Sequence, residues 1–342
     1  MTKTVNIQAF LELSKTFPIL DVRSESEFEM GHMQNAVNIP ILSNEQRKIV
    51  GTLYKQNGRE VAVYKGLELL GPLMSVRLKK GVKLATNGKV LVHCWRGGMR
   101  SQFYAFLLHF YGLESILLEG GYKAFRGLVH QTFDQKLNII VLGGKTGSGK
   151  TVVLKKLAEL GEQIIDLEAI ANHRGSSFGA LGLNEQPSQE QFENALFTAI
   201  YKLDSSRTIW IEDENRTVGS RVIPEGFWNQ MKSSRKIFLI RDFEERLDQI
   251  MLDYSCFPVI DLIISMQRIG KRLGPQHVKR AIECLENGEI REAFEIALGY
   301  YDKAYLFGLE KNKAAEIIML EGIGLTHTEI AGLLSTKKYE KK

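Results

Sequence analysis

A glycine-rich loop at residues 143–151 constrains the fold of this chain more than any other stretch. It reads Gly-Gly-Lys-Thr-Gly-Ser-Gly-Lys-Thr and matches the P-loop pattern G-x-x-x-x-G-K-T. The apolar run 137–142 before it reads as a buried strand, and 152–160 after it has the periodicity of a helix. Because strand, loop and helix follow in the order that the motif requires, the sequence predicts an α/β domain with a phosphate site at this loop.

The same loop contains the groups that bind a diphosphate. Its backbone N–H groups should surround the phosphates, Lys150 should reach the terminal phosphate, and the Thr151 hydroxyl can ligate Mg²⁺. A metal-side carboxylate should come from Asp213 or Glu212, which follow the apolar strand 208–211; a solvated acidic turn is the alternative. The expected phosphate and metal site consists of Gly144, Gly147, Ser148, Gly149, Lys150, Thr151 and Asp213.

A second loop, at residues 93–101, surrounds a cysteine with two glycines and an arginine. It lies between 89–92, expected to be a buried strand, and 102–110, expected to be a helix. N–H groups at a helix start are unpaired and attract anions, and glycines let several of them point at one spot. Because these neighbours and Arg100 favour an anion, we expect Cys94 to be a nucleophile and not a buried structural cysteine.

Two kinds of chemistry fit the cysteine loop. One is sulfur or selenium transfer through a cysteine-bound chalcogen, and the other is phosphate ester hydrolysis through a phosphocysteine. The spacing Cys94-x5-Arg100 with His93 in front matches the signature of cysteine phosphatases. A phosphatase also needs a general acid for its leaving group, and 95–99 contains no carboxylate. An acid can come from elsewhere in the chain, so both chemistries remain open.

Composition indicates a globular chain of more than one domain. Its 342 residues suggest two or three domains, and 44% hydrophobic with 25% charged residues is ordinary for such proteins. A net charge of +5 is compatible with an anionic partner without requiring one. The N-terminal residues lack a signal-peptide core, and no apolar run approaches the ~20 residues that span a bilayer. We therefore expect a cytoplasmic protein with no membrane partner.

The three cysteines fit a reducing compartment. Cys94, Cys256 and Cys284 form no C-x-x-C pair, which argues against a disulfide framework or a zinc cluster. Cys256 and Cys284 lie among apolar residues without a glycine-rich loop, so we expect both of them in the hydrophobic core.

About the first 130 residues resemble the rhodanese domain. The resemblance implies a parallel sheet wrapped by helices, a buried pair of Asp21 and Arg23, and a turn fixed by His32. Ordinary sulfurtransferases carry a loop like Cys-x-x-Gly-x-Arg; this loop is one residue longer, so we expect a transferred group bulkier than a lone sulfur. The motifs that carry the resemblance are Asp21-Val22-Arg23, Glu27-Phe28, Gly31-His32, residues 36–40, the Cys94 loop and Gly120-Gly121-Tyr122.

Helical periodicity dominates two other stretches. Residues 45–84 should be mostly helical with breaks at Gly58 and Gly71-Pro72, and 259–334 should be mostly helical as well. The part that contains the P-loop resembles a nucleoside-kinase-like P-loop fold. We therefore predict an α/β protein with a rhodanese-like parallel-sheet domain at 1–135, a P-loop NTPase-like α/β domain at 136–258 and a helical C-terminal region at 259–342.

Taken whole, the chain resembles the bacterial tRNA 2-selenouridine synthases. The resemblance implies an enzyme that replaces sulfur by selenium in the wobble 2-thiouridine of tRNA. It implies geranylation of that sulfur from geranyl diphosphate, and then its displacement by selenium from selenophosphate. The resemblance rests on Val50-Gly51-Thr52, Tyr54-Lys55-Gln56, residues 94–101, residues 143–151, Asp166-Leu167-Glu168, residues 172–179, Glu212-Asp213-Glu214 and Lys271-Arg272-Leu273-Gly274.

The resemblance also gives the candidate residues their roles. Arg100 would receive selenophosphate, Cys94 would carry its selenium as Cys–S–Se⁻ with release of phosphate, and the P-loop would bind geranyl diphosphate, with Mg²⁺ as an optional ion. The tRNA would contact 265–280, which holds five basic residues and no acid; a solvated helix face is the alternative. We expect a monomer. Candidate tRNA-binding residues are Arg96, His173, Arg174, Arg268, Lys271 and Arg272.

Three other functions fit the same motifs. The first is a nucleotide-dependent tRNA thiouridylase or kinase whose rhodanese domain supplies sulfur. The second is a cysteine-loop phosphatase-like enzyme, and the third is a non-catalytic regulator whose P-loop senses a nucleotide. Binding of ATP, GTP or geranyl diphosphate to the pure protein would separate these alternatives.

Overall fold

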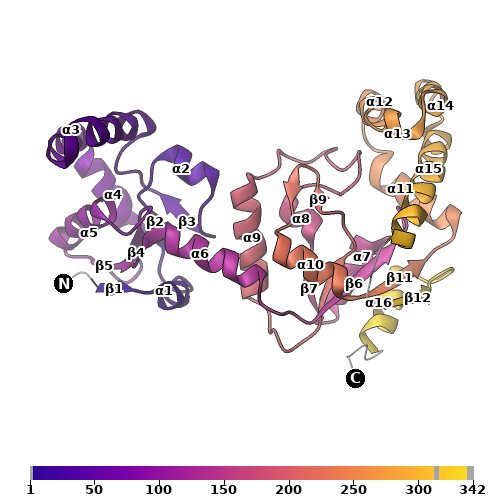
Figure 1. The fold of residues 1–342 in the computed structure, drawn as a ribbon, viewed down its shortest axis with the longest axis horizontal. Helices are drawn as coiled ribbons and strands as arrows, with labels where there is room; N and C mark the ends of the chain where they lie inside the picture. The colour runs from indigo at the N-terminus through magenta and orange to yellow at the C-terminus, as the bar shows by residue number, and fades with distance from the viewer. Residues whose placement is uncertain (1–2, 312–315, 337–342) are drawn as a thin grey trace. The chain divides into compact units, whose positions relative to one another are not determined.

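The chain forms two compact units (Figure 1). The computed structural model describes residues 3–311 and 316–336, without the side chains of 271–272 and 303–311. Unit 1 runs to Thr132 and includes Glu193–Ala195, and unit 2 holds the remainder. Within the described residues, no helix is both long enough and apolar enough to cross a membrane.

Unit 1 contains a sheet of five parallel strands in the order β1-β5-β4-β2-β3. Strand β4 lies in the middle, and four of its five residues are buried. A central parallel strand is covered on both faces, which explains its continuous apolar sequence. The Cys94 loop follows the carboxyl end of β4. The strands are β1 (Lys3–Val5), β2 (Ile19–Asp21), β3 (Ala36–Asn38), β4 (Lys89–His93) and β5 (Glu114–Leu118).

Helices surround this sheet, and the longest is interrupted. Helix α3 begins at a capping box between Ser43 and Gln46 and kinks at Gly58, whose φ is +86° and ψ is −178°. A 3₁₀ turn, η1 (Gly71–Leu73), then separates α3 from α4. Both predicted breaks are therefore confirmed. The helices are α1 (Ile7–Leu13), α2 (Glu25–Met30), α3 (Asn44–Leu70), α4 (Met74–Leu84), α5 (Met99–Tyr111) and α6 (Gly121–Phe133).

Unit 2 contains a second sheet of five parallel strands, in the order β12-β11-β6-β8-β7. Strand β6 lies in the middle, is fully buried and leads into the P-loop. The strands of this sheet are β6 (Ile139–Gly144), β7 (Gln163–Ile165), β8 (Ile209–Glu212), β11 (Arg235–Ile240) and β12 (Ile317–Glu321), and β9 (Thr217–Val218) with β10 (Arg221–Val222) forms a separate hairpin.

Hydrophobic cores among the described residues hold many of the helices of unit 2. One joins α7 and α16 to the sheet through Val153, Leu154 and Ile330, and another packs α11 to α15 around Phe294. The helices are α7 (Lys150–Glu159), α8 (Leu167–Ala171), α9 (Gln189–Tyr201), α10 (Glu225–Ser233), α11 (Phe243–Tyr254), α12 (Val259–Arg268), α13 (Gly270–Leu273), α14 (Pro275–Glu286), α15 (Ile290–Lys311) and α16 (His327–Thr336).

The predicted fold class is confirmed, and two details were wrong. Residues 317–321, expected to be helical, form strand β12, because their apolar run pairs in parallel with β11 at the sheet edge. Cys256, expected in the core, is exposed, since it lies in the turn between α11 and Pro258. Cys284 is buried as predicted. The predicted domain limits at 135 and 258 stay predictions.

Candidate functional site

Two glycines shape the Cys94 loop. Gly97 has a φ of +67°, and a Cβ there would lie 2.8 Å from the Leu118 carbonyl oxygen. Gly121 has a φ of +60°, and a Cβ there would collide with the Cys94 carbonyl oxygen. That oxygen accepts a 2.8 Å hydrogen bond from the Tyr122 backbone N–H. Side chains are therefore excluded at both glycines, and the start of α6 holds the loop against the end of β4.

The Cys94 thiol is buried beside a hydroxyl group. Its side chain is 3% exposed, and its Sγ lies 3.2 Å from the Ser101 Oγ and 3.9 Å from the Gly98 carbonyl oxygen. A hydroxyl at this distance can donate to a thiolate. The Ser101 hydroxyl also donates to the Gly98 carbonyl oxygen at 3.1 Å, so its single proton can go to either acceptor. A proton directed to the sulfur would stabilise a Cys94 thiolate. The sequence singled out Cys94 without giving Ser101 a role, although Ser101 directly follows Arg100.

A carboxylate holds Arg100. Its Nη1 and Nη2 donate to the two Glu27 carboxylate oxygens at 2.6 Å and 3.3 Å, and Glu27 also pairs with Arg47 at 3.1 Å. Burial opposes ionisation of Glu27, but the hydrogen bond from Arg100 holds the pKa of this carboxyl below its ordinary value. Because a guanidinium has five N–H donors, Arg100 keeps donors for an anion at the loop. Sequence reasoning missed this role of Glu27.

The buried polar residues near the Cys94 loop pair with one another and stabilise the fold. Asp21 and Arg23 pair at 2.6 Å with both side chains fully buried, which confirms the predicted pair. Burial opposes ionisation of Asp21, but His93 and Arg23 hold its pKa below the ordinary value. The His93 ring lies 3.6 Å from Asp21, and burial lowers the pKa of His93. His32 stacks on the ring of Phe28 and contacts its carbonyl oxygen at 3.0 Å, so it fixes the turn as predicted.

In unit 2, close packing shapes the P-loop. Gly147 has a φ of +78°, and a Cβ there would lie 2.5 Å from the Arg246 carbonyl oxygen on α11. Gly149 also has a φ of +78°, and a Cβ there would collide with the His327 ring on α16. The Lys150 Nζ donates to the carbonyl oxygen of Gly144 at 3.1 Å. The lysine therefore lies over its own loop, where an anion would meet it.

A buried ion-pair network anchors the P-loop, and sequence reasoning missed it. Arg246 is 3% exposed and donates to both carboxylate oxygens of Asp302 at 2.7 Å, and to the Thr146 carbonyl oxygen at 3.2 Å. Lys145 pairs with the same Asp302 at 3.2 Å. These contacts tie the loop to α11 and α15, which are far away in sequence, so spacing could not reveal them.

Three carboxylates gather beside Thr151. The Thr151 Oγ1 lies 2.8 Å from Glu212 and 3.1 Å from Glu168, and Glu168, Glu212 and Glu214 each offer an oxygen within 4.8 Å of the others. The Glu212 Oε1 is buried without a hydrogen-bond partner among the described residues. Carboxylate and hydroxyl oxygens are the ligands that Mg²⁺ prefers. The arrangement therefore fits a divalent cation next to the P-loop.

The pKa values of these three carboxyl groups also fit a bound cation. Burial and the Glu168 carboxylate raise the pKa of Glu214 to about 8. Burial raises the pKa of Glu212 well above its ordinary value and also raises that of Glu168, against the effect of Lys150. Carboxyl groups this close ionise together only when a cation compensates their charge. Without a cation, at least one of them keeps its proton. The cluster therefore favours a bound cation at neutral and higher pH.

Asp213 lies elsewhere in the pocket wall. Its carboxylate pairs with Lys236 at 2.7 Å, whereas its neighbour Glu212 contacts Thr151. Successive residues of a strand point to opposite faces, which explains the difference. Of the two carboxylates that the sequence proposed, Glu212 is the one beside Thr151. Glu168 on α8 and Glu214 after β8 lie close to Glu212, and both belong to motifs quoted from the sequence.

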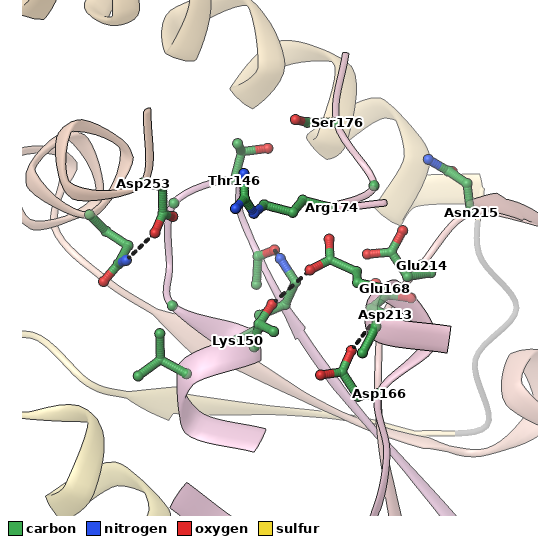
Figure 2. A pocket seen from close by; sticks show the side chains of 18 of the residues that line it. Thr146, Lys150, Asp166, Glu168, Arg174, Ser176, Asp213, Glu214, Asn215 and Asp253 are labelled. Atoms are coloured by element: carbon green, nitrogen blue, oxygen red, sulfur yellow. Dashed lines mark hydrogen bonds between the residues drawn. The ribbon is translucent and has the colours of Figure 1, made fainter. Parts of the chain in front are cut away.

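One pocket of about 1030 Å³ is lined by Lys150, Thr151, Glu168, Asp213 and Glu214 (Figure 2). Figure 2 shows Glu168 and Glu214 next to each other and Arg174 extending across the pocket. Part of the pocket wall is apolar and aromatic. It consists of Leu183, Trp228, Met231, Ile250, Tyr254, Tyr300 and Tyr301. The pocket therefore combines the P-loop with a surface that suits a hydrophobic group.

The other candidate residues differ in exposure and in the element that carries them. Arg174 lines the pocket and donates to the Leu181 carbonyl oxygen at 3.0 Å, whereas His173 is half-buried, and burial lowers its pKa. Arg96 is exposed in the Cys94 loop, and Arg268 is exposed at the end of α12. The remaining two candidates have side chains outside the described part of the chain: Lys271 and Arg272.

Comparison with known proteins gives the family. A family model described as the tRNA 2-selenouridine synthase AAA domain matches residues 137–324, and a model of the rhodanese-like domain matches 7–128. The chain belongs to the tRNA 2-selenouridine synthase family. This membership confirms the resemblance drawn from the sequence, for the rhodanese-like part and for the P-loop part.

Curated members of the tRNA 2-selenouridine synthase family are similar over most of this chain. The protein of that name from Sulfurovum sp. (strain NBC37-1) is 34% identical over 330 residues, 86% of this chain and 89% of that protein. The one from Nitrosomonas europaea is 31% identical over 350 residues and covers 86% and 90%. The one from Pseudomonas syringae pv. tomato is 33% identical over 356 residues and covers 94% of both chains.

Proposed function

We propose that this protein is a tRNA 2-selenouridine synthase, an enzyme that replaces sulfur by selenium in the wobble 2-thiouridine of tRNA. The observation that carries the proposal is the presence of two different anion sites in one chain of this family. One is the Cys94 loop, and the other is the P-loop pocket with its apolar wall. Two successive group transfers to one nucleotide need two such sites.

The first transfer uses geranyl diphosphate. The sulfur of 2-thiouridine attacks the geranyl carbon that carries the diphosphate, so a C–S bond forms and diphosphate leaves. Lys150 and the loop N–H groups stabilise the charge that develops on this leaving group. The apolar wall around Ile250, Tyr254 and Tyr300 gives the prenyl chain a surface to pack on. This use of the loop requires no nucleotide hydrolysis.

A divalent cation can assist that departure. Thr151, Glu168, Glu212 and Glu214 would hold it, and it would supply positive charge beside the diphosphate. Arg174, which lines the same pocket, would bind a phosphate oxygen.

The second transfer uses selenophosphate at Cys94, and its electrons must balance. Thiolate attack on selenium gives Cys–S–Se⁻ and expels phosphite, whereas attack on phosphorus gives phosphocysteine and HSe⁻. Water then converts phosphocysteine to phosphate and the free thiol. Cys–S–Se⁻ together with phosphate, as expected from the sequence, would need an added two-electron oxidant.

We favour attack on phosphorus. The Cys94-x5-Arg100 spacing suits a phosphoryl group, Arg100 is oriented by Glu27, and Ser101 can donate to the Cys94 sulfur when it leaves. The HSe⁻ ion then displaces the alkylated sulfur from the uridine, giving 2-selenouridine and geranyl thiol. Alkylation is what makes that sulfur a leaving group.

Calorimetry with the full chain tests the P-loop assignment. We expect geranyl diphosphate to bind in the presence of Mg²⁺, and Lys150→Ala to weaken this binding severely because the loop loses its fixed cation. Lys156→Ala, a change at a half-buried lysine of α7 that pairs with Glu159 and does not line the pocket, serves as the control and should bind normally. Tight ATP binding together with tRNA-dependent ATP hydrolysis would support a nucleotide-dependent thiouridylase instead.

A further inference from the structure

Part of helix α3 is exposed on nearly every side. From Gly51 to Val61, all described side chains except a half-buried Leu53 are classed as exposed, and Tyr54 is 56% exposed. This stretch contains most of the motif Val50-Gly51-Thr52 and Tyr54-Lys55-Gln56, which the proposed chemistry does not use. A tyrosine this exposed on the surface of a helix offers a contact for a partner.

A kink gives this stretch a fixed shape. Gly58 has a φ of +86°, and a Cβ there would meet nothing within 4 Å. The glycine is therefore needed for its backbone conformation and not for close packing. The kink ends the straight part of α3 just after Tyr54 and Lys55.

Contacts on both sides tie the exposed stretch to the Cys94 loop. Before it, Arg47 pairs with Glu27, the carboxylate that holds Arg100. After it, the Arg59 guanidinium contacts the Met99 sulfur at 3.8 Å, at the start of α5. Tyr54 and Lys55 lie between these two tethers in the sequence, so both ends of their stretch contact residues around the Cys94 loop.

The surroundings are strongly basic. Residues 44–84 contain nine lysines and arginines against three glutamates, a net charge of +6 in a chain whose total is +5. Lys79, Lys80 and Lys83 on α4 are exposed. A polyanion is the partner that complements such a surface.

We propose that the exposed face of α3 binds the single-stranded anticodon loop of the substrate tRNA, with a base stacked on Tyr54 and phosphates at Lys55 and Arg59. This inference rests on the proposed function, since it names the surface that brings the reacting nucleotide to Cys94. Unpaired bases stack on exposed aromatic rings, and neighbouring cations bind the backbone. An acidic protein partner would use the charge without needing the tyrosine ring.

A second Tyr-Lys pair on the same helix provides a matched control. Tyr64 is 67% exposed and is followed by Lys65, beyond the kink and outside the two tethers. The double variants Tyr54→Ala/Lys55→Ala and Tyr64→Ala/Lys65→Ala therefore remove the same groups at two places. Both changes lie at the surface, so the fold is expected to persist, which circular dichroism checks.

The test is fluorescence anisotropy of a labelled anticodon stem-loop containing 2-thiouridine, with the full-length protein across a salt series. We expect Tyr54→Ala/Lys55→Ala to weaken binding at least about fivefold and to reduce the salt slope by about 0.7. The Tyr64→Ala/Lys65→Ala variant should bind within twofold of wild type. Equal binding by both variants would overturn the inference.

Two further readouts separate this inference from the proposed function. Release of phosphate from selenophosphate needs no RNA, so Tyr54→Ala/Lys55→Ala should retain it while losing 2-selenouridine formation. If wild type forms no 2-selenouridine, the proposed function fails. If wild type forms it and the variant binds RNA normally, but loses activity only when selenophosphate is supplied by another protein, the face binds that protein and the inference is wrong.

Discussion

Two buried side chains at the candidate sites each lie beside a hydroxyl group. The Cys94 thiol has the Ser101 hydroxyl at 3.2 Å, and Glu212 has the Thr151 hydroxyl at 2.8 Å. Cys94 is 3% exposed and Glu212 is 1% exposed, so water is largely excluded from both groups. Such groups respond strongly to an incoming ligand, because the ligand supplies what water would otherwise supply.

Replacing the thiol tests the first of these groups. Cys94→Ser should abolish both release of phosphate from selenophosphate and formation of 2-selenouridine, and geranylated tRNA should accumulate. Phosphorus NMR and nucleoside mass spectrometry measure these outcomes. Cys256→Ser, a change at an exposed cysteine, should behave as wild type. Phosphite in place of phosphate would show attack on selenium, and normal selenation by Cys94→Ser would exclude the proposed role.

The carboxylate cluster should make stability depend on pH. Because the pKa of Glu214 is raised to about 8, the folded protein holds a proton there that the unfolded chain loses near pH 4.5. Without metal, its contribution is therefore full below about pH 4.5 and is lost as the pH rises through about 8.

Thermal unfolding with and without Mg²⁺ measures this effect. Mg²⁺ should raise the melting temperature more at pH 8.5 than at pH 6, since deprotonated carboxylates bind it better. Glu214→Gln should flatten the pH dependence and reduce the shift caused by Mg²⁺. An identical Mg²⁺ shift in Glu214→Gln would mean that the cation binds elsewhere.

At the scale of elements, the sequence predicted what depends on local pattern. The P-loop, the Cys94 loop and the breaks in α3 follow from glycines and apolar runs, and the structure has them. Strand β12 and the network of Arg246 with Asp302 depend on pairings between distant segments. No local pattern encodes those partners, which explains why they were missed. Asp213 shows the same limit, because strand alternation and Lys236 decide where it points.

Two glycines with similar φ angles distinguish the stability cost of backbone strain from the cost of a steric clash. Gly147→Ala places a Cβ 2.5 Å from the Arg246 carbonyl oxygen, whereas Gly161, with a φ of +84°, has nothing within 4 Å. Gly161→Ala should cost about 1–2 kcal/mol of stability from its left-handed backbone alone. Gly147→Ala should cost more and also weaken binding of geranyl diphosphate. Chemical denaturation and calorimetry measure both, and equal losses in stability for the two variants would contradict the packing described here.

At the scale of the whole molecule, we expect tRNA to contact a second basic surface. The basic residues of 265–280 include exposed Arg268, Lys279 and Arg280 on α12 and α14. Phosphate contacts there would add affinity without reading the anticodon.

Salt dependence measures that second contribution. Replacing Lys271 and Arg272 by alanine should weaken binding of full-length tRNA and reduce the slope of log affinity against log salt by up to ~0.9 per lost contact. Binding of the isolated anticodon stem-loop and of geranyl diphosphate should remain as in wild type. An unchanged slope with full-length tRNA would identify this stretch as a solvated helix face.

The central claim is that one chain performs both transfers on the same nucleotide. The direct measurement is nucleoside mass spectrometry after incubating the purified protein with 2-thiouridine tRNA, geranyl diphosphate, Mg²⁺ and selenophosphate. We expect S-geranyl-2-thiouridine to appear first and to be converted to 2-selenouridine, with no 2-selenouridine when geranyl diphosphate is omitted. Formation of 2-selenouridine without geranyl diphosphate, or only with ATP, would contradict the account.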